Sequence, residues 1–239
     1  MKVGFVVTVH WSIKIRPKAN LLIKRFLDSL FAFCHYEFNV YVVDNQSEFN
    51  LKEAIHTFYP YERTRYIRID NQKEKGLTGA WNVGLNAAYN DGCDILINCN
   101  DDLWFNETIN AFIDFIESDN NEDSIYGPLT NGVLSSLQKS DRPITRVDRF
   151  PMVEHKCLSG FFFGLTRKNY DKFCFKKDEY FDKDNEHNGG DGKWGGQEGQ
   201  WIQDASRGLI ATIVGDCFIH HDKFRDWRVG KELDEEGNL

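Results

Sequence analysis

Residues 39–47 read NVYVVDNQS, a short run rich in β-branched side chains followed at once by four polar residues. A continuous run of this kind, without alternating polar positions, is typical of a strand that is buried on both faces of a sheet. Such strands occur in parallel sheets that helices cover on both sides. The stretch therefore predicts an α/β fold in which Asp44, Asn45, Gln46 and Ser47 follow the end of an inner strand.

The segments on either side of this stretch alternate between strand and helix patterns. The run VGFVVTV (3–9) predicts a first buried strand, and residues 19–33 carry apolar side chains at a helical spacing. Further along the chain we expect helices over 50–58, 80–89 and 107–118 and strands over 66–69 and 94–98. This alternation predicts a central, largely parallel sheet in an α/β layer fold.

The second half of the chain has a less regular pattern. We expect strands over 157–166 and 210–214, with residues 218–219 leading into His220, and a helix that opens at WGGQE (194–198) and runs to residue 207. The remaining segments predict an exposed loop over 139–149, a charged and glycine-rich mobile segment over 176–193, and a solvated tail over 231–239.

Composition restricts the class of protein. The chain has 239 residues, which suits a single domain over 1–239. Its 37 acidic and 29 basic residues give a net charge of −8, which argues against nucleic acid as the main partner because a phosphate backbone needs a basic face. The 6 cysteines form no C-x-x-C pair and predict free thiols. No apolar run approaches the roughly 20 residues of a membrane helix, so we expect a cytoplasmic protein without a membrane span.

Polar residues that directly follow the predicted strands are the candidate site, because ligands of such sheets bind at the carboxyl ends of the strands. Asn100, Asp101 and Asp102 follow the strand at 94–98. Two adjacent carboxylates suit Mg²⁺ or Mn²⁺, with phosphate oxygens in the remaining positions. The alternative is a helix N-cap formed by Asp102 or Asn106.

Two further features of the first half have a possible ligand-binding meaning. Asp44 and Asn45 carry groups that hydrogen-bond a base or ribose, although a simple turn is the plainer interpretation. Gly76 and Gly79 stand at a predicted helix start, where small residues let the backbone amides approach a phosphate. The chain has neither G-x-G-x-x-G nor a P-loop pattern, which disfavours a dinucleotide-binding site.

Two motifs of the second half suggest chemistry. After the glycine pair Gly195-Gly196, Glu198 lies at a predicted helix N-terminus, where the helix dipole favours the ionised carboxylate of a general base; the neighbouring Trp194 is suited to stacking on a sugar. A turn with an N-terminal glutamate is the alternative. His220-His221 precedes Asp222 and suggests a metal or diphosphate ligand, with a purely structural histidine pair as the alternative.

In their order and spacing these motifs resemble the GT-A class of nucleotide-sugar glycosyltransferases, and most closely the large inverting family two. The resemblance runs from residue 3 to residue 222 and begins with VVDNQS (42–47), which is similar to the family's V-V-D-N/D-x-S. It continues with Gly76, Gly79, Ala80, Asn82 and Gly84, with Asn100-Asp101-Asp102 for a D-x-D motif, with Ser159, Gly160 and Arg167, with WGGQE for W-G-G-E-D, and with a later histidine. The resemblance implies a three-layer GT-A fold around a mixed, mostly parallel sheet, with a nucleotide-binding half over 1–104, an acceptor-binding half over 105–222 and a tail over 223–239.

The resemblance also implies roles for particular residues. For the donor, it implies that Asp44 recognises the base, that Val9 and His10 line the nucleotide pocket, and that Asn45, Gly76, Gly79, Asn82, Asn100 and Asp101 contact the nucleotide-sugar. For a metal, it implies that Asp102 and either His220 or His221 hold Mn²⁺ or Mg²⁺. For the acceptor, it implies that Glu198 is the general base, with Asp191 as a fallback, and that Trp194, Gly195 and Gly196 bind the acceptor. Asn100 and Gln197 depart from the family pattern, since each occupies a position where the family motif has an acidic residue.

The function implied is metal-dependent transfer of a sugar from a nucleoside-diphosphate sugar, most readily a UDP-sugar, with inversion at the anomeric carbon. The acceptor would be a hydroxyl of a free, lipid-linked or protein-linked glycan. A divalent cation would offset the charge between an acidic protein and an acidic diphosphate. One alternative is a degenerate GT-A domain that acts as a non-catalytic binding module, which the two departures suggest. A sugar-nucleotide pyrophosphorylase is disfavoured, because residues 10–18 (HWSIKIRPK) lack the glycine-rich loop of such enzymes.

Overall fold

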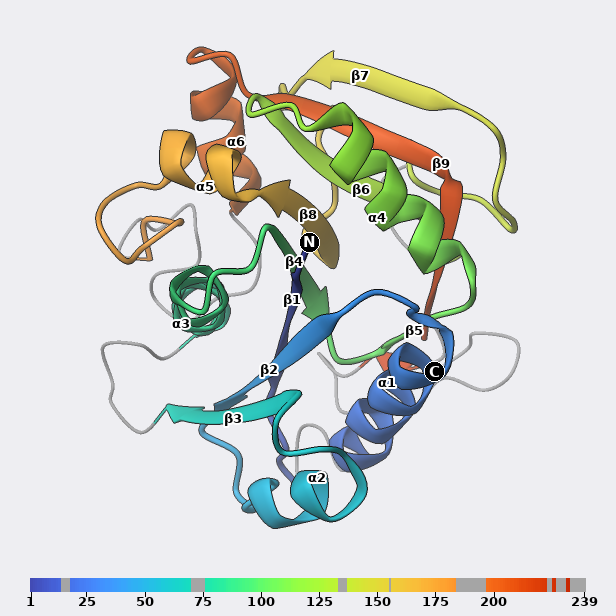
Figure 1. The fold of residues 1–239 in the computed structure, drawn as a ribbon, viewed down its shortest axis with the longest axis vertical. Helices are drawn as coiled ribbons and strands as arrows, with labels where there is room; N and C mark the ends of the chain where they lie inside the picture. The colour runs from blue at the N-terminus through green and yellow to red at the C-terminus, as the bar shows by residue number, and fades with distance from the viewer. Residues whose placement is uncertain are drawn as a thin grey trace.

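A computed structural model describes residues 1–13, 18–69, 76–132, 137–154, 156–183, 197–222, 225–226 and 231–232. For residues 197–198, 225–226 and 231–232 only the backbone is described. Figure 1 shows a single layered arrangement in which a twisted sheet runs through the molecule and helices lie on both of its sides.

The first half of the chain follows the predicted alternation closely. Its elements are β1 (Val3–Val9), α1 (Ala19–Phe33), β2 (Phe38–Asn45), α2 (Lys52–Phe58), β3 (Thr64–Ile69), α3 (Leu77–Asn90) and β4 (Ile95–Asn100). The first strand and the first helix begin and end at the predicted residues, and the other boundaries differ by three residues or fewer.

The second half contains more elements than the sequence predicts. They are β5 (Leu103–Trp104), α4 (Thr108–Asp119), β6 (Ser124–Thr130), β7 (Val147–Pro151), β8 (Phe162–Thr166), α5 (Arg167–Phe173), α6 (Gln197–Ala205), β9 (Ile210–His221), β10 (Arg225–Asp226) and β11 (Lys231–Glu232). The last two pair with each other as a separate antiparallel sheet, so the predicted tail includes ordered backbone.

The main sheet is nine-stranded, with the order β3-β2-β1-β4-β8-β6-β9-β5 and with β7 paired to β9. Strands β3, β2, β1 and β4 are mutually parallel, whereas β8 is antiparallel to both of its neighbours. Strands β6 and β9 are also parallel to each other, whereas β5 and β7 are antiparallel to β9. The sheet is therefore mixed, and the predicted α/β fold class is confirmed.

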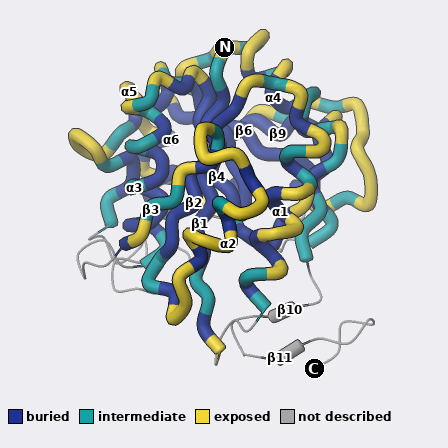
Figure 2. The backbone as a smooth tube through the Cα atoms, turned by 60° about the horizontal axis from the view of Figure 1, so that its bottom comes forward, coloured by how far each residue is buried: buried dark blue, intermediate teal, exposed yellow. Residues whose placement is uncertain are grey.

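Two apolar cores lie on opposite faces of this sheet. Alternate residues of β1 divide between them, with Phe5 and Val7 facing α1 and α4, and Val6 facing α3. Trp201 of α6 and Tyr170 of α5 also belong to the core on the α3 face. Figure 2 shows the inner strands as continuous buried backbone beneath the more exposed helices. The three layers of the predicted fold follow from this division.

Helix α3 approaches the sheet very closely because each side of the contact carries a glycine, Gly84 in the helix and Gly4 in β1. A Cβ atom on Gly84 would lie 2.2 Å from Val6 Cγ1 and 2.9 Å from Val43 Cγ2. A Cβ atom on Gly4 would lie 2.8 Å from Ala88 Cβ. Since Ala88 lies over the start of β1 and Gly84 over its middle, the N-terminus of α3 points toward the carboxyl ends of the parallel strands.

Strand β6 was not predicted because its sequence, SIYGPLT, contains Gly127 and Pro128. Pro128 lies at a register shift between β6 and β9, which is where a strand tolerates a residue that has no N–H group.

The predicted single loop over 139–149 is wrong for its last residues, since Val147–Pro151 forms β7 against β9. Strand β9 runs on to His221, whereas the sequence predicted a strand over 210–214 only.

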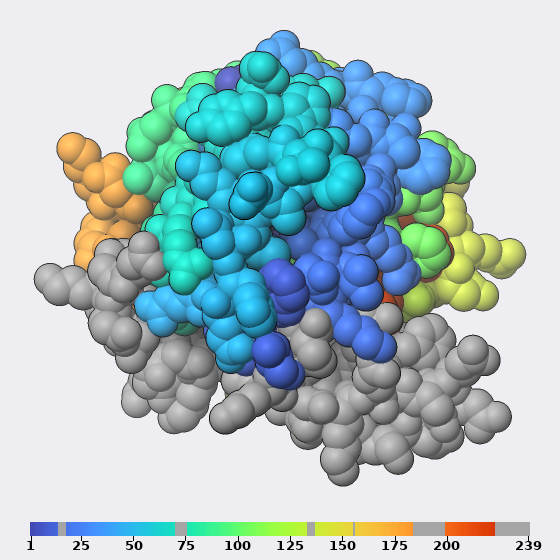
Figure 3. All heavy atoms as spheres, turned by 90° about the horizontal axis from the view of Figure 1, so that it is seen from below, coloured from blue at the N-terminus to red at the C-terminus, as the bar shows by residue number. Residues whose placement is uncertain are grey.

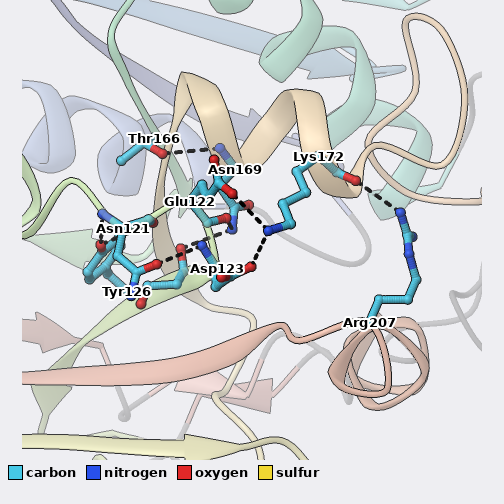
Figure 4. Close-up of polar contacts among 9 residues, drawn as sticks. Asn121, Glu122, Asp123, Tyr126, Thr166, Asn169, Lys172 and Arg207 are labelled. Atoms are coloured by element: carbon cyan, nitrogen blue, oxygen red, sulfur yellow. Dashed lines mark hydrogen bonds and ion pairs between the residues drawn. The ribbon is translucent and has the colours of Figure 1, made fainter.

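The short helix α5 was also not predicted, and polar contacts secure it (Figure 4). The Thr166 side chain caps it by accepting a bond from the Asn169 N–H. Asn169 Nδ2 in turn donates to the carbonyl oxygens of Glu122 and Ser124, and Lys172 forms ion pairs with Glu122 and Asp123. These contacts fix α5 on the start of β6.

Replacing Gly84 with alanine tests the close approach of α3. The added methyl group would overlap Val6, so we expect Gly84→Ala to lower the free energy of unfolding by about 1–3 kcal/mol, as overpacking in cores does. Urea unfolding would measure this loss. Asn86→Ala, on the same helix and outside the contact, serves as the control. A Gly84→Ala protein that is more stable than the wild type, as helix propensity alone would make it, would contradict the account.

Candidate functional site

The ends of three parallel strands lie side by side at one edge of the sheet. Val9 of β1 is in register with Asp44 of β2, and Thr8 is in register with Asn100 of β4. Just beyond β1, His10 Nδ1 lies 2.8 Å from the Asn45 carbonyl oxygen, which accepts a bond from it. The predicted residues at the ends of β1, β2 and β4 are therefore neighbours in space. Figure 3 views the molecule from below relative to Figure 1, and the described surface on this side belongs mainly to the N-terminal part of the chain.

Asp44 is fully buried, and its carboxylate accepts bonds from three donors. The Ser47 N–H donates to Oδ1 over 2.8 Å, and Arg68 pairs with Oδ2 over 3.1 Å. The Tyr66 hydroxyl also donates to Oδ2. Burial, together with this carboxylate, raises the pKa of Tyr66 to about 12, so the hydroxyl keeps the proton that it donates. The carboxylate thus organises the loop after β2, as a turn-forming residue does; contact with a base stays a prediction.

The loops after β1 and β2 are joined by further contacts that the sequence did not reveal. The Trp11 N–H donates to Ser47 Oγ over 2.8 Å, and the Glu48 N–H donates to the Trp11 carbonyl oxygen over 2.8 Å. The rings of Trp11 and Phe49 lie 4.6 Å apart. Trp11 is the second residue after the first predicted strand, and this position was the available signal for it.

Asp101 and Asp102 lie in the short connection between β4 and β5, and both are largely buried. The Asp102 carbonyl oxygen accepts a bond from the Asp222 N–H over 2.9 Å, and β5 pairs with the end of β9. Asn106, rather than Asp102, serves the start of α4, since its Oδ1 accepts bonds from the N–H and hydroxyl of Thr108. The strand pairing therefore brings the two ends of the predicted site together.

His221 meets Asp102 directly. Its Nε2 lies 3.3 Å from Asp102 Oδ2, and its ring stacks on Phe161 with centroids 5.2 Å apart. The His221 N–H also donates to Asn131 Oδ1 over 2.8 Å. Burial by itself lowers the pKa of His221, but the Asp102 carboxylate, the Gly132 backbone and the Asp222 charge together outweigh burial, and the pKa is raised. The contact between His221 and Asp102 therefore favours the protonated imidazole beside the carboxylate.

His220 points to the other side of β9, as alternation along a strand requires. Its ring packs against Trp104 and Phe218, with centroids 4.4 Å and 4.8 Å away. Burial, and after it the nearby Arg25 cation, lowers the pKa of His220. Of the two candidate histidines, the structure therefore places His221 and not His220 beside Asp102.

Gly76 and Gly79 stand at the beginning of α3, which points toward this edge. Gly76 has a φ of 91°, a left-handed conformation that suits glycine. Asn82 is different, because its amide is buried and bonds to the backbone of Phe181. The structure thus anchors Asn82 to another part of the chain.

Several predicted site residues lie outside the described part of the chain. These are Asp191, Trp194, Gly195 and Gly196. The backbone of Glu198 lies in the first turn of α6. Arg167 lies at the opposite edge of the sheet, since the adjoining Thr166 is in register with Ile95 at the start of β4. The tryptophans Trp81 and Trp201 are buried in the core, whereas Trp104 is 37% exposed.

Comparison with known proteins decides the family. The family model described as "Glycosyl transferase family 2" matches residues 18–174, which is more than half of the chain. The chain belongs to glycosyl transferase family 2. The predicted family and its GT-A fold are thereby confirmed, and with them the expectation of a glycosyltransferase.

Solved structures with the same fold include three of TarS residues 1–349 from S. aureus. One, without a ligand in its description, has a TM-score of 0.61 and 15% identity and matches 96% of this chain. The complex with UDP has a TM-score of 0.59 and 14% identity over 92% of this chain, and the complex with UDP-GlcNAc has 0.62 and 12% over 99%. The matches span 63%, 60% and 63% of the TarS chains, respectively. No curated protein sequence matches this chain.

Removing one donor from Asp44 tests the organisation of the strand-end loop. Tyr66→Phe would leave a buried carboxylate with one bond fewer, so we expect the free energy of unfolding to fall by about 1.5–3 kcal/mol, the range for hydrogen bonds to charged groups. Chemical denaturation would measure the change. Tyr61→Phe is the matched control, since Tyr61 is 67% exposed. Equal stability of the two variants would show that the Tyr66 bond contributes nothing.

Proposed function

We propose that this chain transfers a sugar from a nucleoside-diphosphate sugar, with UDP as the nucleotide, to a hydroxyl of a free, lipid-linked or protein-linked glycan. The observation that carries the proposal is the meeting of Asp102 and His221, 3.3 Å apart, at the strand edge of a family 2 chain. The two residues lie far apart in the sequence, and they meet where sheets of this class bind ligands. The UDP and UDP-GlcNAc complexes of TarS, which shares the fold, support a UDP-sugar donor.

The nucleotide end of the donor would lie over the ends of β1 and β2. Val9 and His10 would line this pocket, with Asn45 beside them and Trp11 offering a ring for stacking. Asp44 would fix the shape of the adjoining loop through its three bonds and present it to the base. The amides at the start of α3, next to Gly76 and Gly79, would face the diphosphate.

A divalent cation fits the donor atoms at the Asp102 edge. The carboxylate and the imidazole face each other, and carboxylate oxygen together with imidazole nitrogen suits Mn²⁺ better than Mg²⁺. Among the residues that the structure describes, no group of three or more histidine, cysteine, aspartate or glutamate side chains gathers around a metal site. Asp102 and His221 would therefore be the protein ligands, with Asn100 and Asp101 contacting the donor nearby. When bound, the cation would neutralise charge on the departing diphosphate.

Glu198 would act as the general base. It lies in the first turn of α6, where the helix dipole favours its ionised form. The carboxylate would take the proton of the acceptor hydroxyl as the oxygen attacks the anomeric carbon from the side opposite the diphosphate. The bond to the nucleoside diphosphate breaks as the new glycosidic bond forms, so the configuration inverts. Asp191 is the fallback base, and Trp194, Gly195 and Gly196 would contact the acceptor.

Donor binding tests the nucleotide and metal parts of the proposal. We expect UDP-sugars to raise the melting temperature of the wild-type protein when Mn²⁺ is present, and EDTA to abolish most of that rise, because ligands that bind the folded state stabilise it. Asp102→Ala should lose the Mn²⁺-dependent part of the shift. Asp216→Ala, an exposed aspartate of the same strand as His221, should behave as the wild type. A shift that EDTA leaves unchanged would remove the metal from the proposal.

Removing the base tests the chemistry separately. Glu198→Gln should lower the rate of transfer by about 10²–10⁴-fold, the contribution of general acid–base catalysis, while the donor-induced melting shift stays as in the wild type. Activity would be followed as release of nucleoside diphosphate in the presence of acceptor glycans. Full activity in Glu198→Gln together with a loss in Asp191→Asn would move the base to Asp191. Donor binding without transfer in any condition would favour the non-catalytic binding module.

A further inference from the structure

The segment 180–182, between α5 and α6, is held by two side-chain amides. On one side, Asn82 Nδ2 donates to the Phe181 carbonyl oxygen and Asn82 Oδ1 accepts from the Phe181 N–H, each over 2.8 Å. On the other side, Gln200 Nε2 donates to the Tyr180 carbonyl oxygen over 3.0 Å and Gln200 Oε1 accepts from the Asp182 N–H over 2.9 Å. Four consecutive backbone groups are thus bonded to two amides.

This arrangement reproduces the bonding of a strand between two neighbours. In an antiparallel pair, one residue exchanges both its N–H and its C=O bonds with the residue opposite. Asn82 makes that exchange with Phe181 from α3, and Gln200 bonds the flanking groups from α6. Both amides are buried, at 1% and 7% exposure, so the loss of either would leave backbone groups buried without a partner.

Ring packing joins the same two helices through Phe181. Its ring is fully buried and contacts Trp81 of α3 and Trp201 of α6, with centroids 5.7 Å and 5.9 Å away. The Tyr180 hydroxyl donates to Asn169 Oδ1 over 2.9 Å, which connects the segment to the α5 contacts of Figure 4. The segment 180–182 therefore has polar and apolar contacts to both α3 and α6.

We infer that Asn82 and Gln200 are positioning residues that fix the first turn of α6 against α3, and so determine where Glu198 lies relative to the strand edge. Gln200 is two residues after Glu198 in the same helix. Helix α3 is in turn fixed on the parallel strands by Gly84 and Gly4. A continuous set of contacts thus runs from β1 through α3 and 180–182 to the helix of the base.

This inference rests on the proposed function, because it concerns the base of the proposed reaction. It differs from the role that the family resemblance implies for Asn82, which is contact with the donor. The two roles predict different kinetics, since a donor ligand affects donor affinity whereas a positioning residue affects the rate after binding.

The test uses Asn82→Leu and Gln200→Met, which remove the amides with little change in volume. For the positioning role we expect kcat to fall by about 10–100-fold, because a displacement near 1 Å costs about that much, while the donor Kd changes by no more than about twofold. The double variant should be no worse than about the more damaged single variant, because both changes release the same segment. Asn86→Ala, one turn further along α3 and bonded to Asn90, should match the wild type.

Hydrogen exchange of the backbone amides gives a readout that does not depend on activity. In either variant, exchange should accelerate in α6 while β1, β2 and β4 keep their protection. Uniform loss of protection would overturn the inference by assigning the amides a general structural role. An increased donor Kd with unchanged kcat would overturn it by making Asn82 a donor ligand. If the wild type neither binds a donor nor transfers sugar, the proposed function fails, while the exchange pattern still tests whether the amides fix α6.

Discussion

The close contact of α3 with the parallel strands is the constraint on which the rest of the structure depends. Strand β1 lies between two parallel neighbours, and Gly4 and Gly84 let the helix lie directly on it. Parallel strands end at the same edge of a sheet, so the register of the strands alone makes Val9, Asp44 and Asn100 neighbours. The same contact directs the start of α3 to that edge and gives the segment 180–182 a fixed partner in Asn82. The absence of a side chain at Gly4 and Gly84 thereby determines where several polar groups lie.

The second half of the chain completes the edge from the other direction. Strand β9 spans twelve residues, and its end pairs with β5 directly after Asp102. Because of this pairing, the His221 side chain contacts Asp102 and the His220 ring packs against Trp104. The proposed donor and metal site therefore depends on strand pairing between the two halves, whereas the proposed base depends on amide contacts between α3, 180–182 and α6.

The sequence predicted the first half well because strand, helix and polar strand-end signals agree there. Residues 3–9 and 19–33 follow one pattern from end to end, and the motif VVDNQS marks the end of β2. The second half was harder to predict, since β6 carries a proline at a bulge and α5 depends on a cap and on contacts with β6. Pattern alone also could not separate His220 from His221, because the choice between them depends on which face of β9 meets Asp102. The contact of Asn82 with Phe181 was not predicted because the two residues lie 99 positions apart in the chain.

The central claim, that this family 2 chain transfers sugar from a nucleoside diphosphate, is tested most directly by its products. Phosphorus NMR of a UDP-sugar incubated with the protein, Mn²⁺ and a panel of glycan acceptors would follow both phosphorus atoms during the reaction. The account predicts that the signals of the UDP-sugar are replaced by those of free UDP, in step with the appearance of a new glycosidic bond. Formation of UTP and sugar 1-phosphate in a parallel sample that also contains pyrophosphate, or an unchanged UDP-sugar spectrum with every acceptor, would contradict it.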